Sequence, residues 1–318
     1  MQLNSRLNKR ILILASLVLL TFTLFLFYKI DLNHFDYAIA NRIPKIIAIM
    51  LGGSCIAFTT IIFQTITNNQ ILTPSILGLD SMYVLIQTFI VFMFGSTNLL
   101  IVNKQFNFFV NLILMIFLSI LLYKVLFEKN NNIYFVLLVG MIFGTLFKTS
   151  SSFMQMVIDP NEFLSLQSKL VASINNINTD VLIIALIIAI SIVPFVYDDI
   201  KYLDVISLGR ENAINLSVDY DKTVKKMIII VAILVSISTA LIGPMIFLGL
   251  LVANISRELM KTYLHKYIIT SSILIAMIAL IGGQFIVQYV FDFNITLNII
   301  INFVGGIYFI KLLLKEVI

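Results

Sequence analysis

Long apolar blocks alternate with short polar breaks along the whole chain. Each block is about 17–25 residues long, which is the length that an α-helix needs to cross a bilayer. Polar, glycine-containing stretches lead into the third and eighth blocks, so nine spans are the main alternative to ten. Gly243-Pro244 separates the seventh block from the eighth as a break rather than a loop. The pattern predicts ten spans, over residues 11–30, 43–65, 77–97, 106–126, 133–157, 181–197, 224–243, 244–260, 268–290 and 297–314.

Composition supports a membrane protein. Of the 318 residues, 60% are hydrophobic and only 12% are charged, whereas about a quarter of the residues of a soluble domain are charged. This excludes a disordered chain, a secreted disulfide scaffold and an ordinary cytosolic enzyme. The single cysteine, Cys55, and the isolated histidines His34 and His265 predict no disulfide framework, no metal site and no cofactor. We therefore expect an all-α polytopic membrane protein whose residues 1–318 form a single transmembrane domain.

The net charge of +5 has a simple explanation in a membrane protein and does not indicate a nucleic-acid partner. Basic residues gather in cytoplasmic loops. With the N-terminus inside, the ten-span arrangement places 15 of the 21 Lys and Arg residues on the inner side. This asymmetry predicts that both termini are cytoplasmic, which requires an even number of spans.

Two polar segments interrupt the apolar pattern. One covers about 158–180 on the predicted outer side, and the other covers about 198–223 on the inner side. The inner segment carries two short amphipathic patterns, Leu203, Ile206 and Leu208, then Ala213, Leu216 and Val218. It is either a docking surface for another protein or a solvated connector.

Several kinds of chemistry are missing from the sequence. It contains no GxxxxGK[ST], HExxH or GxSxG motif, so the chain is not expected to be an enzyme or to hydrolyse nucleotide itself. The acidic residues are predicted to lie in loops or at span ends. This argues against an ion-coupled secondary transporter, which normally carries a titratable group near the middle of the membrane.

Lys148 is the one basic residue predicted to lie deep in a span. It lies fifteen residues or so into the fifth block, in the outer third of the bilayer. Its ammonium group could line a water-filled path and attract an anionic solute. The alternative is a lysine that extends to the outer interface.

Small residues occur at the spacing of close helix contacts. Gly140 and Gly144 form a small-xxx-small pair in the fifth span, and Gly305-Gly306 lie in the tenth. Small residues let helix backbones approach in lipid. Tight packing is the prediction for both places.

Three motifs follow one another along the chain. The first starts at Arg42-Ile43-Pro44-Lys45 and continues to Phe63-Gln64, Asn68-Asn69 and Pro74-Ser75-Ile76-Leu77-Gly78. The second runs from Leu208-Gly209 through Ala213 to Leu216-Ser217-Val218, and the third is Gly243-Pro244-Met245-Ile246-Phe247-Leu248-Gly249-Leu250. Together they resemble the integral-membrane subunits of iron-chelate ABC importers, the family of the cobalamin importer permease. The chain is most similar to the second permease of systems for catecholate-type iron chelates.

The resemblance implies a ten-helix type II ABC importer permease fold in the bacterial cytoplasmic membrane. It also implies four kinds of partner: a second homologous permease, two cytoplasmic ATPases, an extracytoplasmic binding lipoprotein and a ferric siderophore. We expect the two permeases to form a heterodimer. ATP hydrolysis by the separate ATPases is expected to move the spans between outward-open and inward-open states.

Residue roles follow from the matched positions. Arg42 and Lys45 match a basic pair that meets the binding protein, with Pro44 expected to fix the helix start. Lys45 stands where arginine is usual, and Ser217 stands where glycine is usual. The ATPase-facing positions are Leu208, Gly209, Ala213 and Leu216, and the path or gate is assigned to Lys148, Asn131 and Asn132.

The predicted function is therefore that of a permease subunit importing ferric siderophores, of the catecholate type. Cobalamin, haem or another metal chelate is the alternative cargo. An ion-coupled secondary transporter is the main alternative from another class, and a membrane-embedded enzyme comes third.

Overall fold

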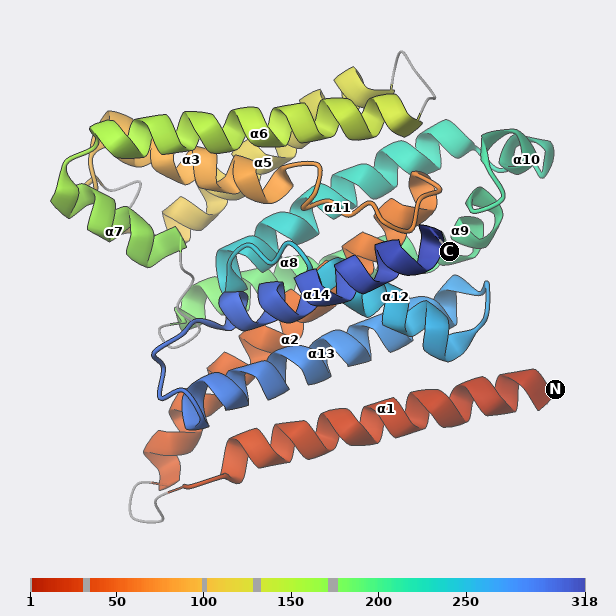
Figure 1. Cartoon of the computed structure of the whole chain (residues 1–318), viewed down its shortest axis with the longest axis horizontal. Helices are drawn as coiled ribbons and strands as arrows, with labels where there is room; N and C mark the ends of the chain where they lie inside the picture. Colours follow the sequence, from red (N-terminus) through yellow and green to blue (C-terminus); the bar gives the residue numbers. More distant parts are fainter. Residues whose placement is uncertain (1, 31–34, 99–101, 128–132, 171–176, 318) are drawn as a thin grey trace. The chain divides into compact units, whose positions relative to one another are not determined.

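The computed structural model describes residues 2–30, 35–98, 102–127, 133–170 and 177–317 (Figure 1). All the regular secondary structure of these residues is helical. Each of the ten predicted spans coincides with one helix: α1 (Gln2–Phe27), α2 (Phe35–Ile66), α3 (Leu79–Phe94), α5 (Lys104–Phe127), α6 (Ile133–Val157), α8 (Thr179–Tyr197), α11 (Tyr220–Ile242), α12 (Leu248–Met260), α13 (His265–Tyr289) and α14 (Leu297–Val317).

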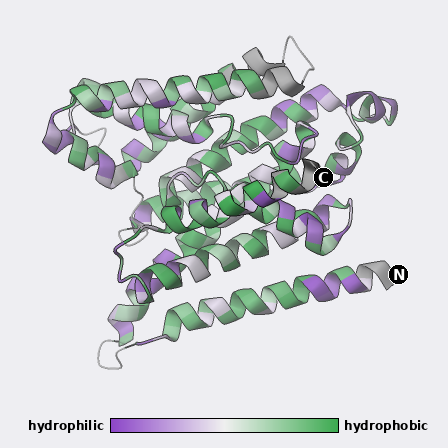
Figure 2. Cartoon of the chain, viewed as in Figure 1, coloured by the Kyte–Doolittle hydropathy of each residue, from purple (hydrophilic) through white to green (hydrophobic). Residues whose placement is uncertain are grey.

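Apolar residues make up most of the length of these helices (Figure 2). Within the described residues, six helices are long and apolar enough to cross a membrane: α1, α2, α5, α8, α11 and α13. Helix α3 and residues Leu297–Lys311 of α14 are shorter apolar helices. The chain is thus an all-α, multi-pass membrane protein.

The break before the eighth span is confirmed. Helix α11 ends at Ile242, Gly243 adopts a φ of 79°, and α12 begins only at Leu248. Helix α12 has 13 residues and is about 20 Å long, so it does not cross a 30 Å hydrocarbon layer alone. Five non-helical residues, 243–247, thus separate the two helices, so α12 begins four residues later than the predicted eighth span.

The described chain divides into two compact units, residues 1–61 with 245–318, and residues 62–244. In the first unit, α13 packs against α1, α12 and α14. Close contacts at glycines support this packing: Gly53 lies against Leu280, Gly249 against Thr60, and Gly305 against Phe247. The Gly305 contact agrees with the tight packing predicted for the last span.

In the second unit, α3 packs along α6 and α5, and α11 packs along α5. Two glycines bring the backbones of residues 75–80 and α6 together, because a Cβ atom built on Gly78 would lie 2.4 Å from the Cα of Gly144. A Cβ built on Gly140 would lie 2.1 Å from the Cδ2 of Leu77. The predicted role of Gly140 and Gly144 as a close-packing pair is confirmed.

An irregular segment, residues 67–78, links α2 to α3. Its backbone forms a series of turns, with Thr67 N donating to Phe63 O, Ile76 N to Thr73 O, and Gly78 N to Ser75 O. Gly144 is the twelfth residue of α6, about 17 Å from the start of that helix. The end of segment 67–78 therefore lies at the depth of the middle of α6, where non-helical backbone is tolerated only when protein buries it.

Candidate functional site

The inner polar segment folds into two short helices, α9 (Ile200–Ile206) and α10 (Arg210–Asn215), at one end of α11 (Figure 1). Leu203, Ile206 and Ala213 are buried, and each is at most 1% exposed. Val218 is also buried. The two predicted amphipathic patterns are thus short helices whose apolar sides face the rest of the unit.

Three large apolar side chains of this segment point to solvent instead. Leu208 is 56% exposed, Ile214 46% and Leu216 58%. Gly209 between the helices has a φ of 96°, which favours glycine. Exposed leucines within a polar segment are unusual and are typical of a surface that another protein covers.

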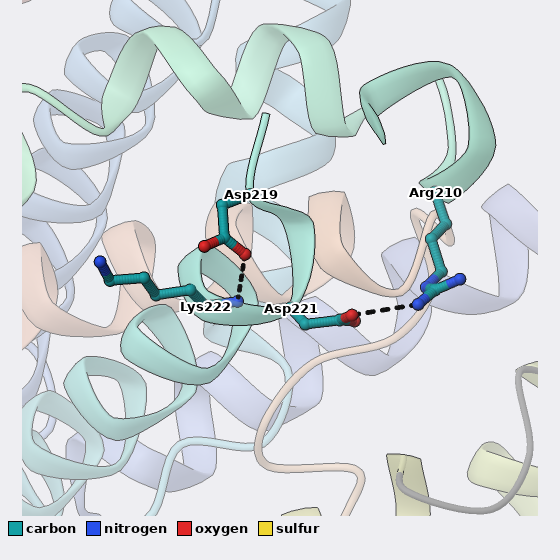
Figure 3. Close-up of polar contacts among 4 residues, drawn as sticks. All are labelled: Arg210, Asp219, Asp221 and Lys222. Carbon is teal, nitrogen blue, oxygen red and sulfur yellow. Dashed lines mark hydrogen bonds and ion pairs between the residues drawn. The ribbon is translucent and has the colours of Figure 1, made fainter. Parts of the chain in front are cut away.

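Ion pairs hold this segment on α11. Arg210 Nη2 lies 3.0 Å from Asp221 Oδ2, and Asp219 caps α11 by accepting a hydrogen bond from the backbone N–H of Lys222 (Figure 3). Lys226 Nζ donates to Asp199 Oδ2 at 2.6 Å and to Phe195 O at 2.7 Å. The second pair is partly screened from solvent, because the Asp199 side chain is 14% exposed. These contacts connect α8, α9 and α10 to the first turns of α11.

Ser217 adopts a φ of 61° after α10. This is the left-handed region that glycine usually occupies. The turn thus forms although serine stands there.

Arg42 lies on α2 and caps the end of α1. Its Nη1 donates to the carbonyl oxygens of Phe25 at 3.2 Å, Leu26 at 2.7 Å and Tyr28 at 3.0 Å. A cation at a helix C-terminus is favourable because the last carbonyls lack helical partners. All three contacts use Nη1, and a guanidinium group has five N–H donors, so the rest of the group can still meet a carboxylate. Lys45, three residues later, is half-buried.

The expectation that Pro44 starts the helix was wrong. Helix α2 begins at Phe35 and continues through Pro44. A proline removes one helical hydrogen bond and its φ already suits a helix, and neighbouring groups compensate for the loss in membrane helices. The 32 residues of α2 span about 48 Å, so α2 is longer than the bilayer is thick.

Lys148 is exposed on α6, on a polar stripe of the helix that also contains Thr145, Thr149 and Ser152. The spacing of three, four and seven residues puts them on one side of the helix. Gly140 and Gly144 are buried, since they lie against Leu77 and Gly78. Helix α6 thus has a close-packed face and an exposed face with a polar stripe.

Asn131 and Asn132 lie outside the described residues. The outer segment 158–180 is described in part. It contains α7 (Pro160–Leu170), whose first residue is a proline, a favoured helix-starting position. Glu162 of α7 accepts a hydrogen bond from the backbone N–H of Ser96 at 3.3 Å.

Asp80 is a candidate residue that the sequence pattern did not reveal. It lies in the first turn of α3, is only 6% exposed, and its Oδ1 accepts from Thr239 Oγ1 of α11 at 3.3 Å. Asp80 thus lies at a span end, as expected of the acidic residues, but this span end is buried within the protein. The only sequence signal is an aspartate two residues after Gly78.

Known proteins resemble this chain over its length. Permease proteins of petrobactin import systems are among its relatives. YclO of Bacillus subtilis (strain 168) is 58% identical, over 96% of this chain and 97% of that protein. FatC of Bacillus anthracis is 37% identical over 90% of this chain and 81% of that protein. FatD of the same species is 25% identical over 87% of this chain and 80% of that protein.

The fold matches a solved structure of a metal-chelate type ABC transporter in an inward-facing conformation. The TM-score is 0.83 at 21% identity, over 97% of this chain and 99% of that one. The chain therefore shares the fold of that transporter chain. The FecCD transport family matches residues 10–315. With nearly the whole chain matched, and with close relatives that are named as import permeases, this chain belongs to the FecCD transport family.

Proposed function

We propose that this chain is a permease subunit of an ATP-driven importer that carries ferric siderophores into the cytoplasm. The observation that carries the proposal is the 58% identity to a petrobactin import permease over nearly the full length of both chains. Petrobactin is the first candidate substrate on this basis, and the catecholate class stays a prediction. Cobalamin and haem are the alternative cargoes. Uptake of iron-55 petrobactin by cells lacking this chain tests the substrate, and normal uptake would contradict it.

The proposed partners follow from the same family. Bacillus anthracis has two petrobactin import permeases, FatC and FatD, and they resemble this chain to different degrees. This supports a heterodimer of this chain with a second permease. Two cytoplasmic ATPases and an extracytoplasmic binding lipoprotein complete the proposed importer, and ATP hydrolysis takes place in the ATPases.

Both termini are proposed to be cytoplasmic. Contacts within residues 1–61 and 245–318 support the even number of spans that puts both termini on one side, and the charge asymmetry favours the inner side. Arg10 donates to the carbonyl oxygen of Leu259, and Tyr289 Oη donates to Tyr28 O at 3.1 Å. Helices α1 and α13 therefore run in the same direction, as an inside N-terminus with ten spans requires.

The cytoplasmic segment 198–223 is the proposed ATPase contact. Leu208 and Leu216 would supply apolar contact area, Gly209 the sharp turn between them, and Ala213 the packing that holds α10 in place. The ion pairs to α11 support a rigid segment that can transmit a push from the ATPase. Asn131 and Asn132 are proposed to form part of a cytoplasmic gate.

Arg42 and Lys45 are proposed to dock the binding protein through acidic residues of that partner. We expect Lys45→Glu to weaken binding-protein affinity about tenfold, because a charge reversal turns an attraction at the rim into a repulsion. Surface plasmon resonance at increasing salt measures this effect, and the difference should shrink as salt screens the charges. Lys266→Glu, at the start of α13, is the matched control. Equal affinities for Lys45→Glu and wild type would contradict the docking role.

Lys148 is proposed to line the translocation path, because a polar stripe on a membrane-spanning helix is better suited to water or a partner subunit than to lipid. We expect Lys148→Met to lower the uptake of an anionic ferric chelate by at least about threefold, since a positive path concentrates anions. The matched control is Lys104→Met, which removes an exposed lysine at the start of α5. Unchanged uptake in Lys148→Met would favour the alternative of a lysine that reaches for the interface.

An ion-coupled secondary transporter remains the second candidate because of one specific observation. The argument against it depended on the lack of intramembrane acids, and Asp80 is a buried acid in the first turn of α3. The two candidates differ in their energy source, which reconstitution can measure.

A further inference from the structure

Helix α11 connects the cytoplasmic segment 198–223 to a buried hydrogen bond far from it. Thr239 is nineteen residues beyond Tyr220, the first residue of α11, which corresponds to about 28 Å along the helix axis. The near end of α11 carries the ion pairs of Asp221 and Lys226. A movement of α9 and α10 would pull on these contacts, and α11 would carry that movement to Thr239.

We propose that the hydrogen bond between Thr239 and Asp80 transmits the movement of α11 to α6, through residues Ser75 to Asp80. This inference rests on the proposed function, because it names the route by which an ATPase stroke would reach the translocation path. Thr239 and Asp80 are positioning residues in it. Neither needs to touch the substrate.

The link between Thr239 and Asp80 joins two helices in a dry environment. Thr239 is 2% exposed and Asp80 is 6% exposed. Asp80 Oδ1 has Thr239 as a partner, whereas its Oδ2 is buried without a hydrogen-bond partner among the described residues. Buried polar atoms are seldom left unpaired. A half-satisfied carboxyl group in the membrane is more consistent with a working contact than with simple packing.

The Thr239 hydroxyl group has two possible acceptors. It lies 2.8 Å from Val235 O in its own helix and 3.3 Å from Asp80 Oδ1. One hydroxyl proton cannot serve both acceptors fully. Ser238 Oγ also donates to Val235 O at 2.9 Å, so this carbonyl keeps a side-chain donor when Thr239 turns to Asp80. The hydroxyl group can therefore donate to either acceptor, and the proposed route uses this choice as its two-state element.

The other half of the route is a contact between backbones. Asp80 follows Gly78, whose φ is 89° and whose Cα carries no side chain to separate it from Gly144 of α6. Leu77 lies in the same way over Gly140. No side chain lies between Gly78 and Gly144 that could move aside. A shift of residues 75–80 toward α6 would therefore shift α6. Lys148 and the polar stripe lie on that helix.

The experiment uses the whole importer in liposomes, with the second permease, the ATPases and the binding protein. It measures iron-55 siderophore uptake and ATP hydrolysis in the same vesicles. We expect Thr239→Val, which keeps the volume but removes the hydroxyl group, to lower uptake about tenfold while ATP hydrolysis continues. The ATP used per iron transported then rises about tenfold.

Ser236→Ala is the matched control. Ser236 is also buried on α11, and its hydroxyl group has no partner among the described residues. The ratio of ATP hydrolysed to iron transported in this variant should stay within about twofold of the wild-type ratio. Asp80→Asn keeps an oxygen acceptor for Thr239 and should retain most of the uptake, whereas Asp80→Leu should resemble Thr239→Val. The Asp80→Leu/Thr239→Val double variant should be no worse than either single variant, because both remove the same link.

Other results would overturn the inference. A normal ratio of ATP to iron in Thr239→Val means that α11 does not act through this hydroxyl group. An equal loss of uptake and hydrolysis in Thr239→Val, with normal assembly by size-exclusion chromatography, leaves the ratio of ATP to iron unchanged and would also contradict the proposed route. A wild-type importer that shows no ATP-driven uptake overturns the proposed function, and the route with it.

Discussion

Replacing Leu208 and Leu216 with glutamate should abolish ATP-dependent uptake and release the ATPase from the permease. Both side chains are more than half exposed on the segment that carries α9 and α10. Loss of an apolar side chain from the core of an interface costs about 1–2 kcal/mol of binding free energy, and a buried unpaired charge adds to that cost. We expect the affinity for the ATPase to fall at least about a hundredfold.

Co-purification of the ATPase and its titration against the permease in nanodiscs measure this effect. Asn215→Glu is the control, since it adds a negative charge to exposed α10 without removing an apolar side chain. Because Leu208 and Leu216 are exposed in the isolated chain, the fold should survive the double substitution. Retention of the ATPase by the double variant would show that this segment is a solvated connector.

Gly78→Ala should be among the most destabilising single substitutions in the chain. Its φ of 89° disfavours any side chain, and the new Cβ would lie 2.4 Å from the Cα of Gly144. The left-handed backbone costs about 1–2 kcal/mol and the overpacking about 1–3 kcal/mol, so the loss is about 2–5 kcal/mol. Because the clash is with backbone, no side chain can turn away to relieve it.

Heating the detergent-solubilised protein and measuring the fraction that stays monodisperse tests this expectation. Gly282→Ala on α13 is the matched control, because a Cβ there meets nothing within 4 Å. In a helix interior alanine is favoured over glycine by about 1 kcal/mol, so this variant should be as stable as wild type or more stable. Equal heat resistance of the Gly78→Ala and wild-type proteins would contradict the close contact of α3 and α6.

The sequence predicted the spans well because hydropathy is strong and local. Ten helices follow ten apolar blocks, and the break at Gly243-Pro244 lies where proline and glycine indicate it. The two short helices α9 and α10 follow from the spacing of Leu203, Ile206 and Ala213. The ordered motifs indicated the family without any structure.

Features that depend on contacts between distant segments were not predictable. Asp80 looks like a residue near a membrane surface until segment 67–78 is seen to end beside the middle of α6. Arg42 has a second role, capping the end of α1, that shows only when its contacts with the last carbonyls of that helix are seen. Pro44 resembles a helix start, yet α2 has nine residues before it. In each case local propensity competes with tertiary packing, which a single sequence does not display.

The most direct test of the central claim is the energy source of transport by the reconstituted importer. Liposomes containing this chain, its companion permease and the ATPases are supplied with binding protein and iron-55 siderophore. The proposed function predicts uptake when ATP is available to the ATPases and no uptake with a non-hydrolysable ATP analogue, whether or not an ion gradient is present. Uptake that follows a proton or sodium gradient without ATP would contradict it and would make Asp80 the first residue to examine as the coupling acid.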